Sequence, residues 1–472
     1  MSALAGPRDH DGPAGLAVVA SADLTARAGA ISELFADAVR EGDRVVLLGS
    51  MEADAVAALL AARAQKLSLV PIDSSFSLEE TAFAINDSRA RLVLVEPARW
   101  PFADQLRVLT PEVESWAVLR SGAGRTRMLP DVPDQVTGTL HYSAAGTGRP
   151  TAYRVADPVV DPQGRRDLTA LLGTQELTDV SCVVLTSELS DPAALQLSVA
   201  AHAAGSRIAI AAGGRPEDVM AAVDGASHAV VQLSPATALA LAKALDAGLP
   251  VARPPRLALI AAPGCPAPVT HRLVEAWGPV LRQVYLAPGV GAVAAIEGVD
   301  VVLFPGTMGQ PLDDPGAPPV RIRGEGGSAV GLIEAEVPAG SGRWTAWGDH
   351  GRMERGRLVV LDRHHADSDR NAPTMPQAVE AALVAHPWVA DVAVVVRKDT
   401  LKQRVIAFVE PTHDADRARL VATLHEELAS RFPADWVPAR IEVASSLPRT
   451  ATGKLDRRRL RTFDPIDCST PA

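Results

Sequence analysis

The alternation of short apolar runs with helix-like stretches limits the possible folds of this chain more than any other feature. Between residues 44 and 96, Val- and Leu-rich runs typical of buried strands are separated by stretches with a helical pattern. The strands are expected at 44–50, 68–73 and 90–96, and the helices at 52–65 and 77–88. Ser77 followed by Glu80 predicts a capping box at the start of the second helix. This order indicates a parallel sheet with crossover helices.

The same alternation returns in the middle of the chain and then changes character. Buried strands are expected at 181–187, 207–212, 228–234 and 256–262, with alanine-rich helices between them. Such sheets bind ligands at the carboxyl ends of their strands. From about residue 300, three apolar runs look like antiparallel strands joined by Gly-rich turns: VVLFPG (301–306), AVGLIEAEVP (329–338) and RLVVLD (357–362). We therefore expect an α/β fold with layered parallel sheets and a small β-rich subdomain.

A polar, turn-prone segment, 361–373, is expected to separate two domains. The first would span residues 1–362. The second, 363–472, contains strand and helix patterns of a small α+β unit, and the 472 residues are too many for one ordinary core.

Charge and composition exclude some classes of protein. A net charge of −10 argues against a general nucleic-acid binder, which needs an excess of Lys and Arg. The N-terminus has no apolar core for a signal peptide, and we find no run of about 18 apolar residues for a membrane span. The three cysteines match no metal spacing, so reduced thiols are expected. The expectation is a soluble cytoplasmic protein.

Three motifs indicate nucleotide chemistry, although each also has an ordinary structural interpretation. HYSAAGTGRPTAYRV (141–155) is rich in Gly and hydroxyl residues, which suits a phosphate-cradling loop or a plain turn. Gly348-Asp349 offers a carboxylate that can accept both ribose hydroxyls, or simply a turn Asp. LPRTATGKLDRRRLR (447–461) places Lys454 on a Thr-rich turn before a basic helix, where its ammonium could reach a phosphate or belong to a solvated tail.

Taken in order, these segments resemble the adenylate-forming superfamily of acyl- and aryl-CoA synthetases, nonribosomal-peptide adenylation domains and luciferases. The resemblance extends from about residue 15 to 462, and the closing motif around Lys454 is its most specific part. It implies a mobile C-terminal domain and two half-reactions. A carboxylate attacks the α-phosphate of ATP to give an acyl-adenylate and pyrophosphate, and a thiol or amine then takes the acyl group.

The resemblance also implies roles for individual residues. Lys454 corresponds to the catalytic lysine that contacts the carboxylate and the α-phosphate, and His365 to the hinge position. The implied nucleotide-binding residues are Asp349 for the ribose, Arg363 beside it, Tyr285 against adenine, Gly264 lining the adenine and acyl pockets, and Ser143, Gly146, Thr147 and Gly148 in the phosphate loop.

Several positions depart from the family pattern. Pro150-Thr151-Ala152 replaces the usual Pro-Lys-Gly, so the lysine that helps to hold the triphosphate is missing, and Arg149 and Arg154 are the nearest cations. Gly289 stands where a glutamate usually binds magnesium, so no metal ligand is expected there. Arg370-Asn371 replaces a Gly-Gly pair near the pantetheine path, which argues against a standard CoA-thioester step.

The pattern of retained and lost residues leaves three functions open. The first is a divergent ligase that uses ATP to activate a small carboxylic acid for a carrier protein, an amine or another nucleophile. The second is a transferase that takes AMP-linked acyl groups, that is, a preformed acyl-adenylate, without its own MgATP step. The third is a catalytically silent relative that binds or regulates a partner. In each case the acyl pocket is expected among residues 182–191, 232–237 and 261–265.

Overall fold

The computed structural model describes most of the chain, with gaps. The described residues are 15–35, 38–120, 138–143, 150–173, 175, 177–251, 253–262, 265–313, 316–324, 330–363, 379–380, 382–383, 386–399, 402–412, 415–432, 436–449, 455 and 457–462. Four sheets of three or more strands and one two-stranded hairpin make up its β-structure.

The first sheet is parallel throughout, with the strand order β3-β2-β4-β5. Its strands are β2 (Arg44–Leu48), β3 (Ser68–Pro71), β4 (Leu92–Val95) and β5 (Ser115–Val118). The associated helices are α1 (Ser21–Ser32), α2 (Ala53–Ala64), α3 (Leu78–Ser88) and α4 (Trp100–Leu109), with a short 3₁₀ turn η1 (Pro97–Arg99). The predicted capping box at Ser77 and Glu80 is confirmed, since each side chain bonds the backbone N–H of the other residue.

The second sheet has eight strands in the order β1-β9-β8-β10-β11-β12-β13-β14, and its five central strands from β9 to β12 run parallel. The strands are β1 (Leu16–Val19), β8 (Cys182–Leu185), β9 (Arg207–Ala211), β10 (Ala229–Gln232), β11 (Leu257–Ile260), β12 (Leu281–Ala287), β13 (Gly291–Glu297) and β14 (Gln310–Pro311). Its helices are α5 (Pro162–Leu172), α6 (Pro192–Ala203), α7 (Pro216–Asp224), α8 (Pro235–Asp246) and α9 (Ala267–Trp277), with 3₁₀ turns η2 (Leu177–Asp179) and η3 (Ala212–Gly214).

Helices between the two sheets form the main core. Alanine-rich α2 and α6, with α1 and part of α5, pack apolar side chains of both sheets into one cluster. Helices α7, α8 and α9 cover the other face of the second sheet, and α3 and α4 cover the other face of the first. The abundance of alanine fits this arrangement, because small side chains allow close approach of helix and sheet.

The hairpin of β6 (Thr139–Ser143) and β7 (Thr151–Val155) lies alongside the first sheet, where Ser68 Oγ donates to the Gly138 carbonyl. A four-stranded antiparallel sheet follows later in the chain: β15 (Val320–Arg323), β16 (Val330–Glu336), β17 (Trp344–Glu354) and β18 (Arg357–Arg363). Its inner side chains pack against β12 and β13 in a separate apolar cluster.

The expected strand at 301–306 is wrong. Residues Asp300–Leu303 form a one-turn helix, α10, in which Val301 is buried and Leu303 is 65% exposed. An apolar run this short carries no usable periodicity, so helix and strand cannot be separated by pattern.

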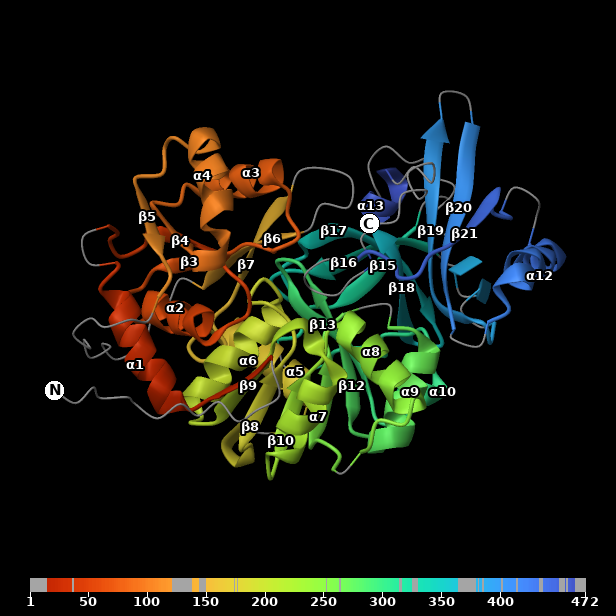
Figure 1. The fold of residues 1–472 in the computed structure, drawn as a ribbon, viewed down its shortest axis with the longest axis horizontal. Helices are drawn as coiled ribbons and strands as arrows, with labels where there is room; N and C mark the ends of the chain where they lie inside the picture. The colour runs from red at the N-terminus through yellow and green to blue at the C-terminus, as the bar shows by residue number, and fades with distance from the viewer. Residues whose placement is uncertain are drawn as a thin grey trace.

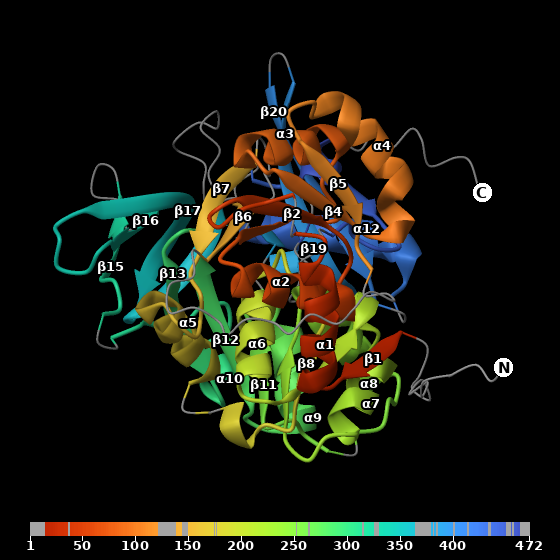
Figure 2. The ribbon, with the colours of Figure 1, turned by 90° about the vertical axis from the view of Figure 1, so that its left-hand side faces the viewer.

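The C-terminal unit is a three-stranded sheet with helices on both faces. Its elements are β19 (Val389–Asp399), β20 (Lys402–Pro411), β21 (Arg440–Val443), α12 (Arg417–Arg431) and α13 (Arg457–Thr462). Helix α12 packs on one face and α13 on the other. In both views this unit and the first sheet lie above the second sheet (Figures 1 and 2). The α/β fold with layered parallel sheets, a small β-rich subdomain and a C-terminal α+β unit is confirmed, whereas the exact boundary at 362/363 stays a prediction.

Candidate nucleotide and acyl site

The carboxyl ends of β8, β10, β11 and β12 form one edge of the second sheet. The strand order reverses between β8 and β10, and such a switch point opens a crevice at the carboxyl edge. The described residues that follow β8, β10 and β11 in the three expected acyl-pocket segments, 186–191, 233–237, 261–262 and 265, come directly after the carboxyl ends of these strands. The segments that the sequence pattern assigned to one pocket therefore follow neighbouring strands of the same sheet.

Gln232 fixes the loop that follows β8. Its side-chain Oε1 accepts from the backbone N–H groups of Thr186 (3.1 Å) and Ser187 (3.2 Å), and its Nε2 donates to Ser187 Oγ (2.8 Å) and Asp191 Oδ2 (3.2 Å). All four hydrogen-bonding positions of this buried amide are used within the protein. Gln232 consequently fixes this loop and is not free to bind a ligand.

Tyr285 and Asp349, 64 residues apart in sequence, are in direct contact. The Tyr285 hydroxyl donates to Asp349 Oδ2 at 2.5 Å, between the end of β12 and the middle of β17. Trp347 Nε1 donates to the Tyr285 hydroxyl at 2.7 Å and to Asp349 Oδ2 at 3.1 Å. Tyr285 is 1% and Asp349 7% exposed, so the carboxylate lies at the inner wall of the site.

Arg363 lies directly across from Asp349. The two residues are paired in the antiparallel register of β17 and β18, with an irregularity in the ladder between Asp349 and Gly351. The backbone thus places the predicted ribose carboxylate and its predicted arginine on neighbouring strands. Their roles toward a nucleotide stay predictions.

The predicted phosphate loop joins β6 to β7. Ser143 and Thr151 close the hairpin, where the Thr151 N–H donates to Ser143 Oγ at 3.3 Å. Gly146, Thr147 and Gly148 lie outside the described residues, as does Arg149. Arg154 is directed to the far end of the hairpin, because a Cβ added at Gly138 would lie 3.1 Å from its Nε. Among the described residues, Arg154 therefore does not replace the missing loop lysine.

His141 on β6 connects this hairpin to the loop that follows β8. Its Nδ1 lies 3.1 Å from the Ser190 carbonyl and its Nε2 3.0 Å from Thr139 Oγ1. A carbonyl oxygen can only accept, so the ring proton is on Nδ1 and Nε2 accepts from the hydroxyl. Burial lowers the pKa of His141 to about 4, which keeps the ring neutral at physiological pH.

Gly289 lies in the turn between β12 and β13, with a positive φ of 72°. A Cβ there would lie 3.6 Å from Tyr153 Cβ on β7, so the turn lies against the hairpin of the phosphate loop. An L-residue in this left-handed conformation costs about 1–2 kcal/mol, so the backbone itself disfavours a glutamate at this position.

The carboxylates nearest in sequence or space do not replace a magnesium ligand. Glu297 is at the opposite end of the β12–β13 hairpin and pairs with Arg282. Asp167 on α5 packs behind the turn, where its Oδ1 accepts from the Ala292 N–H (2.9 Å) and from Arg166 (3.0 Å), and burial raises the pKa of this carboxyl. Among the described residues we find no cluster of His, Cys, Asp and Glu that could hold a metal.

Lys454, Gly264 and His365 lie outside the described residues, but the neighbours of the first two approach each other. Arg449 and Leu455, on either side of Lys454, form an antiparallel bridge, and Arg449 pairs with Asp391. Burial raises the pKa of the Cys265 thiol, in the residue after Gly264, to about 12. The charges of Arg449 and Asp391 also affect this pKa, the first lowering it and the second raising it. The flanks of the closing motif therefore lie near the carboxyl edge of β11.

Sequence reasoning missed Trp347 and Asp167, and it placed Gln232 in an expected pocket segment without its role in fixing the loop after β8. Trp347 was detectable in principle, because it lies two residues before Asp349 and residues i and i+2 of a strand share a face. Gln232 and Asp167 had no such signal, since their partners come from other elements.

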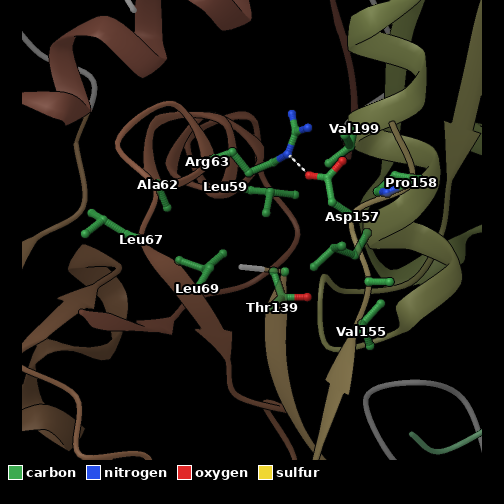
Figure 3. A pocket seen from close by; sticks show the side chains of 13 residues that line it. Leu59, Ala62, Arg63, Leu67, Leu69, Thr139, Val155, Asp157, Pro158 and Val199 are labelled. Atoms are coloured by element: carbon green, nitrogen blue, oxygen red, sulfur yellow. Dashed lines mark hydrogen bonds and ion pairs between the residues drawn. The ribbon is translucent and has the colours of Figure 1, made fainter. Parts of the chain in front are cut away.

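A small hollow lies between α2, β3, the β6–β7 hairpin and α6 (Figure 3). Leucine is the commonest residue of its lining. Arg63 and Asp157 form a buried ion pair at its rim, with Nε 2.5 Å from Oδ2. This hollow is apart from the residues expected to bind nucleotide.

Comparison with known proteins gives two family matches. The model of the AMP-binding enzymes matches residues 21–157, and that of the AMP-binding enzyme C-terminal domain matches residues 378–454. An acetyl-coenzyme A synthetase of Nitrosomonas europaea is 31% identical over 208 residues, covering 38% of this chain and 31% of that enzyme. A probable non-canonical nonribosomal peptide synthetase, CymA, of Salinispora arenicola is 29% identical over 93% of this chain but only 6% of its own length. The matches thus span less than a third of each of these two relatives.

Solved structures share the fold over nearly the whole chain. ATP-bound MatB from Rhodopseudomonas palustris has a TM-score of 0.74 at 18% identity, covering 94% of this chain and 93% of MatB. The amide bond synthetase McbA from Marinactinospora thermotolerans has a TM-score of 0.72 at 22% identity, covering 93% and 94%. Within the described residues, no helix is both long and apolar enough to cross a membrane.

Proposed function

Because the chain belongs to the adenylate-forming superfamily, we propose that it activates a carboxylic acid as an acyl-adenylate and passes the acyl group to a nucleophile. The observation that supports this most is the meeting of Tyr285 and Asp349, with Arg363 on the adjacent strand. These residues are far apart in sequence, and they are the ones that the family resemblance assigns to one nucleoside.

The proposed first step forms a bond between a carboxylate oxygen of the acid and the α-phosphorus of ATP, with pyrophosphate leaving. Asp349 would accept hydrogen bonds from ribose hydroxyls, and Lys454 would contact the carboxylate and the α-phosphate. In the second step a nucleophile attacks the acyl carbon and AMP leaves. An amine or a carrier-protein thiol is the proposed acceptor, in line with the relatedness to an amide bond synthetase and a peptide synthetase.

The crevice at the carboxyl edge is the proposed acyl pocket. Gln232 and Asp191 are engaged in fixing its loop, so the surface left to the acid comes mainly from small and apolar side chains. An apolar or aryl acid is therefore the proposed substrate class.

The test is carboxylate-dependent release of AMP over a panel of small apolar and aryl acids. Wild-type protein should release AMP only with its acid. Lys454→Ala should lower the rate by about two to three orders of magnitude, as expected when a charge that stabilises a transition state is lost. Lys66→Ala is the matched control, because Lys66 pairs with Glu41 on the first domain's surface. AMP release that is independent of acid, or unchanged in Lys454→Ala, would reject the proposal, and no AMP release with any acid would favour a silent or regulatory relative.

Gly289 favours a second candidate, a transferase that accepts a preformed acyl-adenylate. Gly289 offers no carboxylate for magnesium, and Arg154 is directed away from the loop. Missing charge-assisted contacts of about 1.5–3 kcal/mol each would weaken MgATP binding by orders of magnitude. Titration calorimetry with MgATP, AMP and a non-hydrolysable acyl-AMP analogue separates the two functions. A protein that binds the acyl-AMP analogue but not MgATP favours the transferase. Tight binding of MgATP excludes the transferase.

A further inference from the structure

Trp347 donates a hydrogen bond to Asp349, the carboxylate that the proposed function assigns to ribose binding. Its indole N–H is shared between the Tyr285 hydroxyl at 2.7 Å and Asp349 Oδ2 at 3.1 Å. Tyr285 gives its own proton to the same Oδ2 at 2.5 Å. Two protein donors therefore converge on this one oxygen, and the three groups form a continuous chain of hydrogen bonds. Such chains strengthen each bond in a buried setting.

The two donors differ in how firmly they are held. Tyr285 is almost completely buried between the second sheet and the small antiparallel sheet, whereas Trp347 is half-buried at the border of that cluster. The rings are 6.2 Å apart at an angle of 54°, a tilted contact rather than a stack. The indole can therefore leave Asp349 with less disruption of the core than the phenol.

We propose that Trp347 determines nucleoside selectivity by competing with ribose hydroxyls for Asp349. A ribose that binds both carboxylate oxygens has to displace the indole N–H from Oδ2. The binding free energy gained from a ribose hydroxyl is then only the difference between its hydrogen bond to Asp349 and the indole bond that it replaces. The site therefore discriminates weakly between a ribonucleoside and a deoxyribonucleoside. This inference rests on the proposed function, because it assumes that the ligand of Asp349 is a nucleoside.

The test compares wild-type protein with Trp347→Phe, which keeps an aromatic ring beside Tyr285 but removes the indole donor. Binding of AMP and of 2′-deoxy-AMP is measured by titration calorimetry. Loss of a hydrogen bond to a charged group predicts that AMP binds about tenfold more tightly to the variant. The preference for AMP over 2′-deoxy-AMP should rise by a similar factor, and a purely structural role of Trp347 would not change this ratio.

Trp344→Phe is the matched control. Trp344 is also half-buried on β17, but its ring is covered by Arg321, with the guanidinium carbon 3.9 Å from the ring centre. Both affinities should stay as in the wild type. If Trp347→Phe does not fold, wild-type fluorescence provides the second measurement. AMP should shift the tryptophan emission as the indole loses its acceptor, and 2′,3′-dideoxy-AMP should not.

The outcomes distinguish this inference from the function on which it rests. Equal AMP affinity and an equal AMP to 2′-deoxy-AMP ratio in wild type and Trp347→Phe would overturn the inference alone. Failure of both proteins to bind AMP or an acyl-AMP analogue would overturn the nucleoside assignment as well.

Discussion

At the scale of single residues, His141 is the group whose protonation matters most to the fold around the site. It is fully buried on β6, two positions before Ser143, and it links the hairpin to the loop after β8 through the Ser190 carbonyl. A positive charge here would have no solvent and would oppose the bond from Thr139. The neutral ring is therefore part of what holds the phosphate-loop hairpin against the second sheet.

This predicts a pH-dependent stability. The pKa of His141 is about 4 in the folded protein and near 6.5 in an unfolded chain. Above pH 6.5 the ring is neutral in both states. Between 6.5 and 4 only the unfolded chain takes up the proton, so the free energy of unfolding falls by about 1.4 kcal/mol per pH unit from this group. Urea unfolding of wild type and His141→Asn from pH 7.5 to 4.5 checks this. The variant should lose this part of the slope, and identical slopes would contradict the role of His141.

The sequence identified some residues of the site and missed others for a physical reason. The Ser77–Glu80 capping box is a local interaction over three positions, and Tyr285 and Asp349 belong to motifs with recognisable neighbours. Trp347 and His141 each also bond a partner on another element, Tyr285 and the Ser190 carbonyl, and no local spacing carries that part of the information. Lys454, the most specific residue of the sequence pattern, lies outside the described residues, so its role rests on the motif and on its neighbours Arg449 and Leu455.

At the scale of elements, a buried ion pair joins helix α2 to the segment that follows strand β7. Arg63 Nε lies 2.5 Å from Asp157 Oδ2, with side chains 6% and 2% exposed (Figure 3). A second nitrogen of the guanidinium, Nη2, is buried without a protein partner. The charges are therefore fully removed from water, and the removal of one of them leaves the other uncompensated.

Arg63→Met is expected to destabilise the protein by about 3–5 kcal/mol, because Asp157 would remain buried without its cation. Arg27→Met is the control. Arg27 pairs with Asp54 at the start of α2, but its side chain is 43% exposed, so less than about 1 kcal/mol should be lost. Chemical unfolding measures both. Similar losses in the two variants would show that burial of the pair is not what holds α2.

Elements with a clear period were predictable, and those without one were not. Seven parallel strands of the two sheets follow from short apolar runs separated by helical patterns, whereas the parallel strands β5 and β12 were not expected. Strand β1 pairs with β9, 190 residues away, and α10 is a single turn, so neither had a distinguishing pattern. The order of strands in the second sheet likewise depends on packing of α6 between two sheets rather than on any local signal.

At the scale of the whole molecule, an ion pair joins the C-terminal unit to a helix of the second sheet. Lys243 on α8 pairs with Glu410 at the end of β20, and the Leu447 N–H donates to the same carboxylate at 3.3 Å. Asp391 and Arg449 of this unit act on the Cys265 thiol. The polar segment 361–373 predicted two domains. Because Lys243 and Glu410 are 167 positions apart, the sequence gave no indication that this pair would join them.

This docking predicts the reactivity of one thiol. Cys265 is buried and its pKa is raised to about 12, so it should react slowly with a thiol reagent at pH 8 in a Cys468→Ser background. Lys243→Glu places like charges at the contact with Glu410 and should speed the reaction by about tenfold, as the undocked population grows.

Arg272→Glu is the control, because Arg272 on the neighbouring helix pairs with Asp246 of the same unit. Cys182, 2% exposed inside the second sheet, should stay unreactive in all variants, and Cys265→Ser should remove the signal. Equal rates in wild type and Lys243→Glu would mean that this ion pair does not hold the C-terminal unit over the carboxyl edge of β11. Faster labelling would instead show that the approach of the closing motif to the proposed adenylate site depends on a contact outside that site.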